Sequence, residues 1–408
     1  MTGGPRVRRL SAWDAERLRG LAADHGTPLY VVDLERVREN ATRLRAAFDR
    51  EDVSYAVKAN TVGAVMETVA DTGLHAECAS AGEVVRALDA GFEGPNLRYT
   101  AVNPPDEDLD IVVDRADTGL TVTIGAEDTL DRLAERGYDG PLCVRVNPGV
   151  GAGHSAKVTT GDAPKFGVPA ARVSALVADA RDRGFDVVGL HAHAGSGISA
   201  AQLDAHRELV SRMGDLARAV GDLEFVNVGG GFGVPYRPDE DPLELDSVAA
   251  ATREALGDVD ATLGVEPGRY VVADAGVLLS RVNTVKETPE TVVVGVDAGM
   301  TTLVRPAMYD AYHHLRSLAP DAADRSTVET MVAGPICETS DVLARDRPLP
   351  APERGDLLAV GNAGAYGYEM ASHYNSRPRP AVVVTDGDES RVAARREDLT
   401  DVTRLEHS

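Results

Sequence analysis

The stretch Val53-Ser54-Tyr55-Ala56-Val57-Lys58-Ala59-Asn60 joins a short apolar run to a single lysine. An apolar run of this length is typical of a buried strand. Lysine is rare in the chain, with four among 408 residues, and nearly all other cations are arginine. Because arginine stays protonated and cannot act as a nucleophile, Lys58 indicates a need for an amine, and Schiff-base chemistry is the first hypothesis.

The pattern around Lys58 recurs from residue 53 to residue 266, where short apolar runs alternate with amphipathic segments. Eight candidate strands begin near Val53, His75, Leu97, Thr121, Leu142, Val187, Glu224 and Thr262. Eight strand-helix units in about 220 residues predict a closed (β/α)8 TIM-like barrel. A doubly wound open sheet is the alternative, but it does not explain why chemically useful residues follow so many separate strands.

These residues are predicted to lie at the carboxyl ends of the strands. Lys58 follows the first strand, His193 and Ser196 follow the sixth, and the glycines 229–231 follow the seventh. The run 266–269, which contains Glu266, Gly268 and Arg269, follows the eighth. Barrel enzymes build their active sites at this face, and strands seven and eight commonly supply a phosphate site. The glycine run therefore predicts a phosphate cradle, with a plain turn as the alternative.

Three motifs have competing explanations. Lys58 is either a nucleophile whose pKa is lowered by burial and positive neighbours, or a lysine paired with a carboxylate such as Glu77. The scarcity of lysine and the glycine-rich loop favour the nucleophile with a lowered pKa. His191 and His193 share one face of a strand, but a metal would need a third ligand, so we expect His193 to stack on a flat cofactor ring. Glu266 is either an exposed acid or a carboxylate facing a pyridine nitrogen.

Composition excludes several classes of function. A formal net charge of -23 argues against nucleic acid or anionic lipid as a partner. No stretch reaches the roughly 18 to 20 apolar residues that span a bilayer, and the first 19 residues lack a signal-peptide centre, so we expect a cytoplasmic protein. Cys78, Cys143 and Cys337 form no CxxC pair, which argues against a disulfide framework or a zinc site.

The charge balance also suggests adaptation to high salt. Scarce lysine, abundant arginine and excess carboxylate crowd like charges, which concentrated salt screens. An acidic mesophilic protein encoded by a GC-rich genome is the alternative.

The pattern changes after Arg269. The runs 277–285, 291–296, 330–333, 356–360 and 381–385 are β-like and lack regular helices between them. They predict an all-β carboxyl-terminal domain. We expect the barrel at 30–272 and the β domain at 273–408, with 1–29 contributing a strand to the latter. The segment 147–167 is rich in glycine, threonine and serine and is interpreted as an active-site loop.

A set of motifs, taken together, resembles one family. The motifs are YAVKAN at 55–60, GLHAHAGSGI at 189–198, NVGGGFG at 227–233, EPGRY at 266–270, DAGM at 297–300, VRPAMY at 304–309, GPICETSD at 334–341 and GAYGYEMASHYNSRPRP at 364–380. In this order they resemble the diaminopimelate decarboxylases, fold-type III enzymes that use pyridoxal 5'-phosphate and include ornithine and arginine decarboxylases. The resemblance implies an alanine-racemase-like barrel and decarboxylation of meso-2,6-diaminopimelate to L-lysine and CO2, the last step of lysine biosynthesis.

The resemblance also implies residue roles. Lys58 would attach the cofactor, His193 would stack on it and Cys337 would be the proton donor. The implied cofactor-binding positions are Lys58, His193, Ser196, Gly229, Gly230, Gly231, Glu266, Gly268, Arg269 and Tyr366. The implied substrate-binding positions are Arg269, Arg305, Tyr309, Glu338 and Tyr366. Because the segment with Cys337 and Glu338 enters the neighbouring subunit's site in this family, a homodimer is implied.

Three departures bear on the substrate. Glu77 stands where relatives usually carry aspartate, Gly197 stands where many carry glutamine, and CETSD replaces the commoner CES form. Arg305 favours diaminopimelate, because a guanidinium suits a distal carboxylate. The alternatives are a related decarboxylase of the ornithine, arginine or carboxynorspermidine type, a fold-related racemase, and a non-catalytic homologue that binds pyridoxal phosphate.

Overall fold

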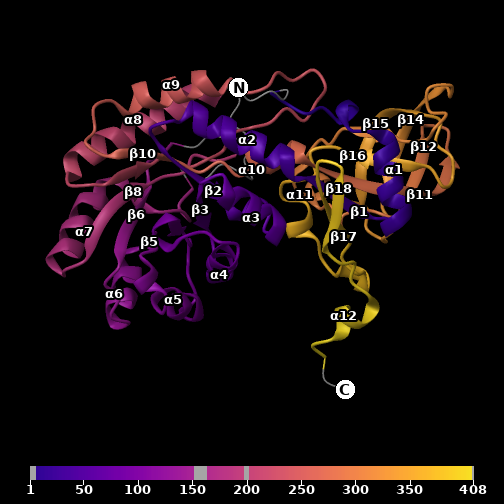
Figure 1. Cartoon of the computed structure of the whole chain (residues 1–408). Helices are drawn as coiled ribbons and strands as arrows, with labels where there is room; N and C mark the ends of the chain where they lie inside the picture. Colours follow the sequence, from indigo (N-terminus) through magenta and orange to yellow (C-terminus); the bar gives the residue numbers. More distant parts are fainter. Residues whose placement is uncertain (1–5, 151–162, 197–201, 407–408) are drawn as a thin grey trace.

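Two sheets lie side by side in the computed structural model, which describes residues 6–150, 163–196 and 202–406 (Figure 1). The first is a barrel of eight parallel strands within these ranges, in the order β5-β4-β3-β2-β10-β9-β8-β6. Pairing of β5 with β6 closes it. The strands are β2 (Asp52–Ala56), β3 (His75–Cys78), β4 (Leu97–Tyr99), β5 (Thr121–Ile124), β6 (Pro141–Asn147), β8 (Asp186–His191), β9 (Phe225–Asn227) and β10 (Thr262–Val265).

Amphipathic helices cover the outside of this barrel (Figure 1). They are α2 (Leu34–Ala47), α3 (Gly63–Asp71), α4 (Ala81–Asp89), α5 (Asp106–Val113), α6 (Glu127–Glu135), α7 (Ala170–Asp182), α8 (Leu203–Val220) and α9 (Leu245–Leu256). Local sequence fixes several starts: Asp33 and Ser80 accept hydrogen bonds from the first-turn amides of α2 and α4. The short α10 (Arg269–Val272) follows β10, and the two-residue β7 (Val168–Pro169) pairs with β6.

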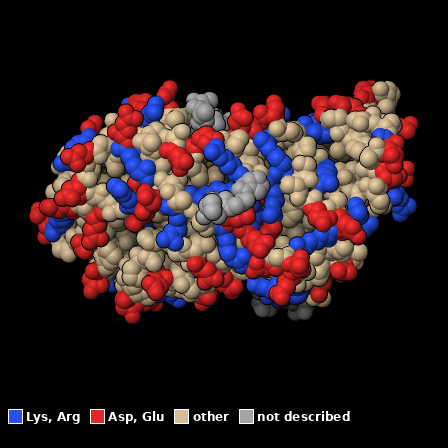
Figure 2. Space-filling model, turned by 45° about the horizontal axis from the view of Figure 1, so that its top comes forward, with Lys and Arg blue, Asp and Glu red and all other residues tan. Residues whose placement is uncertain are grey.

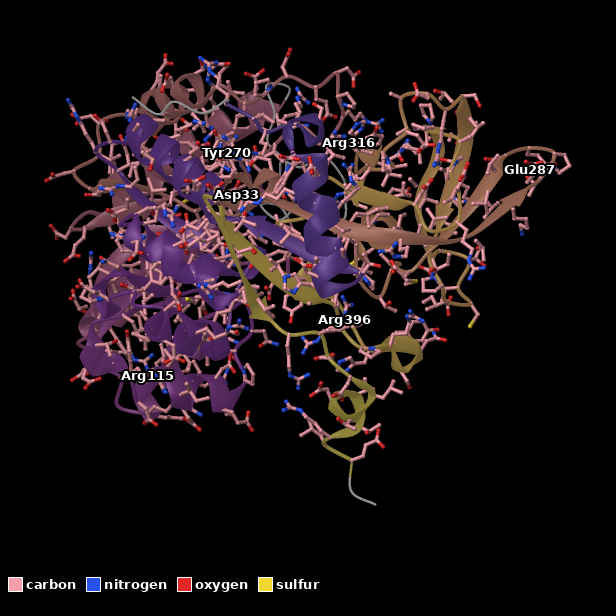
Figure 3. The ribbon with its side chains drawn as sticks, turned by 45° about the vertical axis from the view of Figure 1, so that its right-hand side comes forward. Asp33, Arg115, Tyr270, Glu287, Arg316 and Arg396 are labelled. Carbon is pink, nitrogen blue, oxygen red and sulfur yellow. The ribbon has the colours of Figure 1, made fainter. Side chains whose placement is uncertain are left out.

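The second sheet is mixed. It comprises β1 (Leu29–Asp33), β11 (Gly276–Glu287), β12 (Val292–Val296), β13 (Leu315–Ser317), β14 (Thr327–Ala333), β15 (Val342–Pro350), β16 (Leu357–Val360), β17 (Ala381–Asp386) and β18 (Glu389–Ala394). β1 pairs antiparallel with β11 and parallel with β17. In Figure 3, Asp33 lies at the barrel side of this sheet and Glu287 at the far end of β11. An apolar cluster that includes Trp13, Leu21 and Leu357 lies under α1 (Ala15–His25).

The predicted barrel and the predicted β-rich second half are both confirmed. All eight expected strand starts lie within a residue of the observed ones. The prediction missed β13, β15 and β18, and two short helices interrupt the second half: α11 (Arg305–Tyr309) and α12 (Leu399–Thr403). α12 extends away from the body toward the carboxyl terminus (Figure 1). Within the described ranges, every helix is too short or too polar to span a bilayer.

A buried ion pair joins the amino-terminal helix of the barrel to the chain that leaves it. Arg36 on α2 is fully buried, and its Nη2 lies 2.7 Å from Asp274 Oδ2. Asp274 also accepts hydrogen bonds from Asn40 Nδ2 at 2.8 Å and from the backbone amide of Arg8 at 2.8 Å. One carboxylate therefore binds donors from two other segments, α2 and the chain around Arg8.

We predict that Asp274→Ala lowers the free energy of unfolding by about 3 to 5 kcal/mol, because it removes the buried carboxylate that binds the Arg36 guanidinium. Asp386→Ala is the matched control. It breaks the exposed Arg38–Asp386 pair and should cost less than about 1 kcal/mol. Urea-induced unfolding measures the free energy of unfolding of both variants. Equal losses in this free energy would contradict a structural role for the buried Arg36–Asp274 pair.

Candidate functional site

Lys58 lies in the 3-10 turn Val57–Ala59 directly after β2. Its Nζ is 2.9 Å from Oε2 of Glu77, which is buried on β3, while the Lys58 side chain is 43% exposed. Desolvation at Nζ opposes the charged amine, but the Glu77 carboxylate outweighs it and holds the pKa of Lys58 above its ordinary value. The expected lowering of this pKa is therefore wrong for this structure, and the pairing with Glu77 is the reason.

Glu266 follows β10, which pairs with β2, so it lies beside Lys58 in the same pocket. Its Oε2 is 3.0 Å from Nε2 of His191, and its buried Oε1 has no hydrogen-bond partner among the described residues. Burial alone would raise the pKa of Glu266, but His191 and Lys58 outweigh it and hold the pKa below its ordinary value. The pocket therefore contains a carboxylate with one oxygen held and one oxygen open to a donor.

His193 lines the same pocket two residues beyond His191. Its Nδ1 accepts a hydrogen bond from the backbone amide of Gly230 at 3.2 Å. Burial, together with the positive charges of Lys58 and Arg145, lowers the pKa of His193 to about 3. The imidazole is therefore neutral near pH 7, which suits packing against a flat ring.

The glycines after β9 have no room for side chains. A Cβ on Gly230 would lie 2.0 Å from the backbone oxygen of Glu266, and one on Gly229 would lie 2.6 Å from Nδ1 of His193. Gly229 also has a positive φ of 77°. This loop is thus a close-fitting backbone cradle at the edge of the pocket, as a phosphate site requires.

Two arginines lie beside the cradle. Arg269 Nη2 donates to Ser196 Oγ at 3.0 Å, and its Nη1 donates to the Tyr236 hydroxyl at 2.8 Å. The Arg305 guanidinium lies 5.6 to 5.9 Å from the ring centres of Tyr236, Tyr309 and Tyr366. Arg305 is 4% exposed, and its Nε has no hydrogen-bond partner among the described residues.

The carboxyl-terminal part of the chain completes one wall of the pocket. Tyr366 lines it, and the Tyr366 amide donates to the Ala59 carbonyl at 2.8 Å, next to Lys58. Tyr366 also stacks with Arg269, whose guanidinium is 4.8 Å from the ring centre. The pocket is therefore built jointly by the barrel and by the segment between β16 and β17.

The structure brings together most, but not all, of the residues expected from the sequence. Pocket-lining residues include Lys58, His193, Ser196, Gly230, Gly231, Glu266, Gly268, Arg269 and Tyr366. Cys337 and Glu338 are exposed instead. Cys337 Sγ lies 3.7 Å from Asn375 Oδ1, and the Tyr374 hydroxyl donates to Glu338. Gly197 and most of the expected loop 147–167 lie outside the described residues.

Sequence reasoning missed two members of the site. Tyr236 contacts both arginines, but it stands beyond the glycine run without a recognisable motif. His191 received no role, although its alternation with His193 placed both on one face. In the described part of the chain, no group of three or more His, Cys, Asp or Glu side chains is arranged to hold a metal ion.

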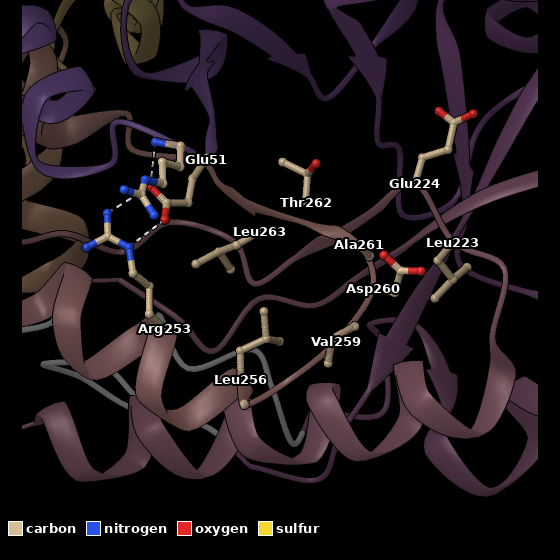
Figure 4. Close-up of a pocket in the computed structure, with 12 residues that line it drawn as sticks. Glu51, Leu223, Glu224, Arg253, Leu256, Val259, Asp260, Ala261, Thr262 and Leu263 are labelled. Carbon is tan, nitrogen blue, oxygen red and sulfur yellow. Dashed lines mark hydrogen bonds and ion pairs between the residues drawn. The ribbon is translucent and has the colours of Figure 1, made fainter.

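Charge is distributed unevenly over the surface. On the face shown in Figure 2, Lys and Arg gather in the middle, where the barrel and the second sheet meet, and Asp and Glu dominate the outer ends. A second hollow lies at the opposite end of the barrel, near the starts of β9 and β10 (Figure 4). Its Arg253 is paired with Glu51 at 2.5 Å. By barrel geometry, this end serves stability rather than chemistry.

Comparison with known proteins agrees with this geometry. Residues 34–273 match the family described as "Pyridoxal-dependent decarboxylase, pyridoxal binding domain". The chain is 42% identical to a diaminopimelate decarboxylase of Methanothermobacter thermautotrophicus over 94% of this chain and 92% of that protein. It is 35% identical to one of Streptomyces coelicolor, over 97% and 93%.

Solved structures give the same result. The crystal structure of diaminopimelate decarboxylase from Helicobacter pylori complexed with L-lysine matches with a TM-score of 0.87 and 30% identity, over 95% of this chain and 98% of that one. A lysine/ornithine decarboxylase from Vibrio vulnificus, at 22% identity and a TM-score of 0.79, shares the fold. Because relatives above 30% identity align with nearly the whole chain, the protein belongs to the diaminopimelate decarboxylases, a family of enzymes that depend on pyridoxal phosphate.

Proposed function

We propose that the protein converts meso-2,6-diaminopimelate into L-lysine and CO2, the last step of lysine biosynthesis. The observation that carries the choice of substrate is the buried Arg305, a second cation beside Arg269 whose Nε has no hydrogen-bond partner in the described part of the chain. The cofactor phosphate would pair with Arg269. The distal carboxylate of diaminopimelate would then pair with Arg305. Ornithine would bring an ammonium to the same guanidinium, which is unfavourable.

The pocket fits pyridoxal phosphate. The close-packed Gly229 and Gly230, the neighbouring Gly231 and Arg269 suit its phosphate. Oε1 of Glu266, which has no hydrogen-bond partner among the described residues, suits a protonated ring nitrogen. His193 would pack against the ring, and Lys58 would attach the cofactor through Nζ. When bound, pyridoxal phosphate supplies an electron-accepting ring for the electron pair left on the substrate's α carbon as CO2 departs.

The chain's own residues handle protons and orientation. The Lys58 ammonium must lose a proton before its nitrogen can act as a nucleophile, and Glu77 at 2.9 Å is placed to accept it. Glu266 would keep the proton on the ring nitrogen. Arg305 would orient the far end of the substrate with Tyr309, so that the carboxylate that leaves is the one at the reacting carbon.

The proton donor would come from a second copy of the chain. Cys337 and Glu338 are exposed and are not among the residues that line the pocket with Lys58. We therefore propose a homodimer in which the segment 334–341 of each subunit completes the site of the other. Cys337 would then deliver a proton to the α carbon, and Glu338 would contact the substrate's distal amine.

The glycine cradle gives the first prediction here. Gly230→Ala should lower the affinity for pyridoxal phosphate by at least about tenfold, since the added Cβ would meet a backbone oxygen at 2.0 Å. Gly20→Ala is the control, because a Cβ there has open space on α1. Equilibrium binding of pyridoxal phosphate to cofactor-free protein measures both affinities. An unchanged affinity for Gly230→Ala would contradict the assignment of this loop as the phosphate site.

The shared site gives the second prediction. Lys58→Ala and Cys337→Ala should each be nearly inactive alone. Mixed after reversible dissociation, they should recover about a quarter of wild-type turnover, because random pairing makes half the dimers mixed and each mixed dimer has one intact site. No recovery, with mixed dimers confirmed by mass spectrometry, contradicts the shared site.

The substrate assignment gives the third. Release of CO2 and lysine from meso-diaminopimelate should exceed release of CO2 from ornithine, arginine or carboxynorspermidine. Arg305→Met should reduce kcat/KM for diaminopimelate by about 10- to 100-fold through loss of charge-assisted hydrogen bonds, with little change in cofactor affinity. Arg172→Met, at an exposed pair on α7, is the control. Preference for ornithine, or equal loss of cofactor affinity, would overturn the assignment.

We also propose a cytoplasmic protein adapted to high salt, with domains at 30–272 and 273–408. The net charge of -23 brings repulsion among the carboxylates, and dissolved salt screens that repulsion. The midpoint of thermal unfolding should fall as salt is withdrawn. A midpoint independent of salt concentration would count against the adaptation.

A further inference from the structure

His191 is the buried histidine of the pocket region that the proposed reaction leaves without a role. It is the last residue of β8 and is 3% exposed. Its Nε2 lies 3.0 Å from Oε2 of Glu266, which is 6% exposed. Both groups belong to strands that end at the same face of the barrel, so their contact is fixed by the fold.

The unpartnered atoms of this pair define its hydrogen-bond pattern. Nδ1 of His191 and Oε1 of Glu266 are both buried without a hydrogen-bond partner among the described residues. A carboxylate oxygen only accepts hydrogen bonds, so Nε2 of His191 carries the hydrogen and donates to Oε2 of Glu266. Oε1 of Glu266 is left as an open acceptor.

The surrounding charges favour the ionised form of Glu266. Glu266 is faced by Lys58 from the turn after β2, by His193 after β8 and by Arg145 on β6, which pairs in register with His191. Positive charge on Lys58 and Arg145 favours a carboxylate over a carboxylic acid at Glu266.

A carboxylate in a pocket does not hold one orientation unaided. The terminal χ3 torsion of glutamate has a broad distribution of angles. A glutamate without a second hydrogen bond can therefore turn either oxygen, or neither, toward a ring nitrogen. The hydrogen bond from His191 occupies Oε2 and leaves Oε1 as the open acceptor. The same bond stabilises the charged form against burial.

We propose that His191 is a positioning residue that holds Glu266 ionised and turned so that Oε1 meets the ring nitrogen of pyridoxal phosphate. This inference rests on the proposed function, in which Glu266 serves that nitrogen. His191, the first histidine of the His-Ala-His motif, then has a role different from that of His193. His191 itself is not among the residues that line the pocket.

The structure offers a matched control. His206 on α8 is 1% exposed, its Nε2 lies 2.8 Å from Thr252 Oγ1, and its Nδ1 is likewise unpartnered. It does not line the pocket. His191→Leu and His206→Leu therefore each remove one buried imidazole with one hydrogen bond, and their shared effects report loss of packing alone.

The test compares His191→Leu, His191→Gln and His206→Leu in the wild-type and Glu266→Gln backgrounds. We expect His191→Leu to lower kcat by about 10- to 100-fold with KM within about twofold, as for residues that orient a ligating group. It should also shift the pH dependence of the bound cofactor's visible absorbance. His191→Gln keeps a donor near the Nε2 position and should recover most of both readouts.

In the Glu266→Gln background, His191→Leu should cause little further loss, because the group it positions is gone. Three results would overturn the inference. They are full additivity of the losses in kcat caused by His191→Leu and Glu266→Gln, equal losses in kcat for His191→Leu and His191→Gln, and the same pH profile of absorbance for His191→Leu and His206→Leu. Failure of the proposed function is distinguishable, since the wild-type protein would then neither bind pyridoxal phosphate nor release CO2.

Discussion

The pairing of β2 with β10 is the constraint on which the site depends. Gly264 and Val265 lie in register with Asp52 and Val53, so the residues that follow these two strands emerge side by side. Lys58 and Glu266 are far apart in sequence, yet both line one pocket for this reason. Because the strands are parallel and the barrel is closed, the loops after β3, β8 and β9 converge on the same place.

A second constraint comes from the carboxyl-terminal half. The Tyr366 amide binds the Ala59 carbonyl, and Glu369 accepts from the amide of Thr61 at 2.8 Å. These contacts tie the segment after β16 to the turn that holds Lys58. The pocket is thus walled partly by the β-rich half, and a barrel alone would leave it open. Arg305, on α11 in that half, reaches the site by the same arrangement.

The fold was predictable from sequence because its signals are local. Apolar runs such as Val53–Ala56 and Phe225–Asn227 are buried throughout, and strands of that kind are recognisable without knowledge of their partners. Glycines and charged residues at the strand ends then located the pocket. β13 and β18 were missed because they are short or largely exposed, which leaves a weak apolar pattern.

The rest depends on distances that a sequence does not contain. The pKa of Lys58 was expected to fall, but the carboxylate of Glu77 reaches Nζ and reverses the direction. The partner of His191 lies on another strand, and Tyr236 carries no motif of its own. Cys337 was assigned by resemblance, and in this chain it is exposed and does not line the pocket with Lys58.

The central claim is that Lys58 is the residue to which pyridoxal phosphate attaches. Borohydride reduction of the cofactor-loaded protein, followed by digestion and mass spectrometry, measures this directly. The account predicts one pyridoxyl label per chain, on the peptide that contains Lys58. A label on the peptide of Lys157, Lys165 or Lys286, or no label at all, would contradict it.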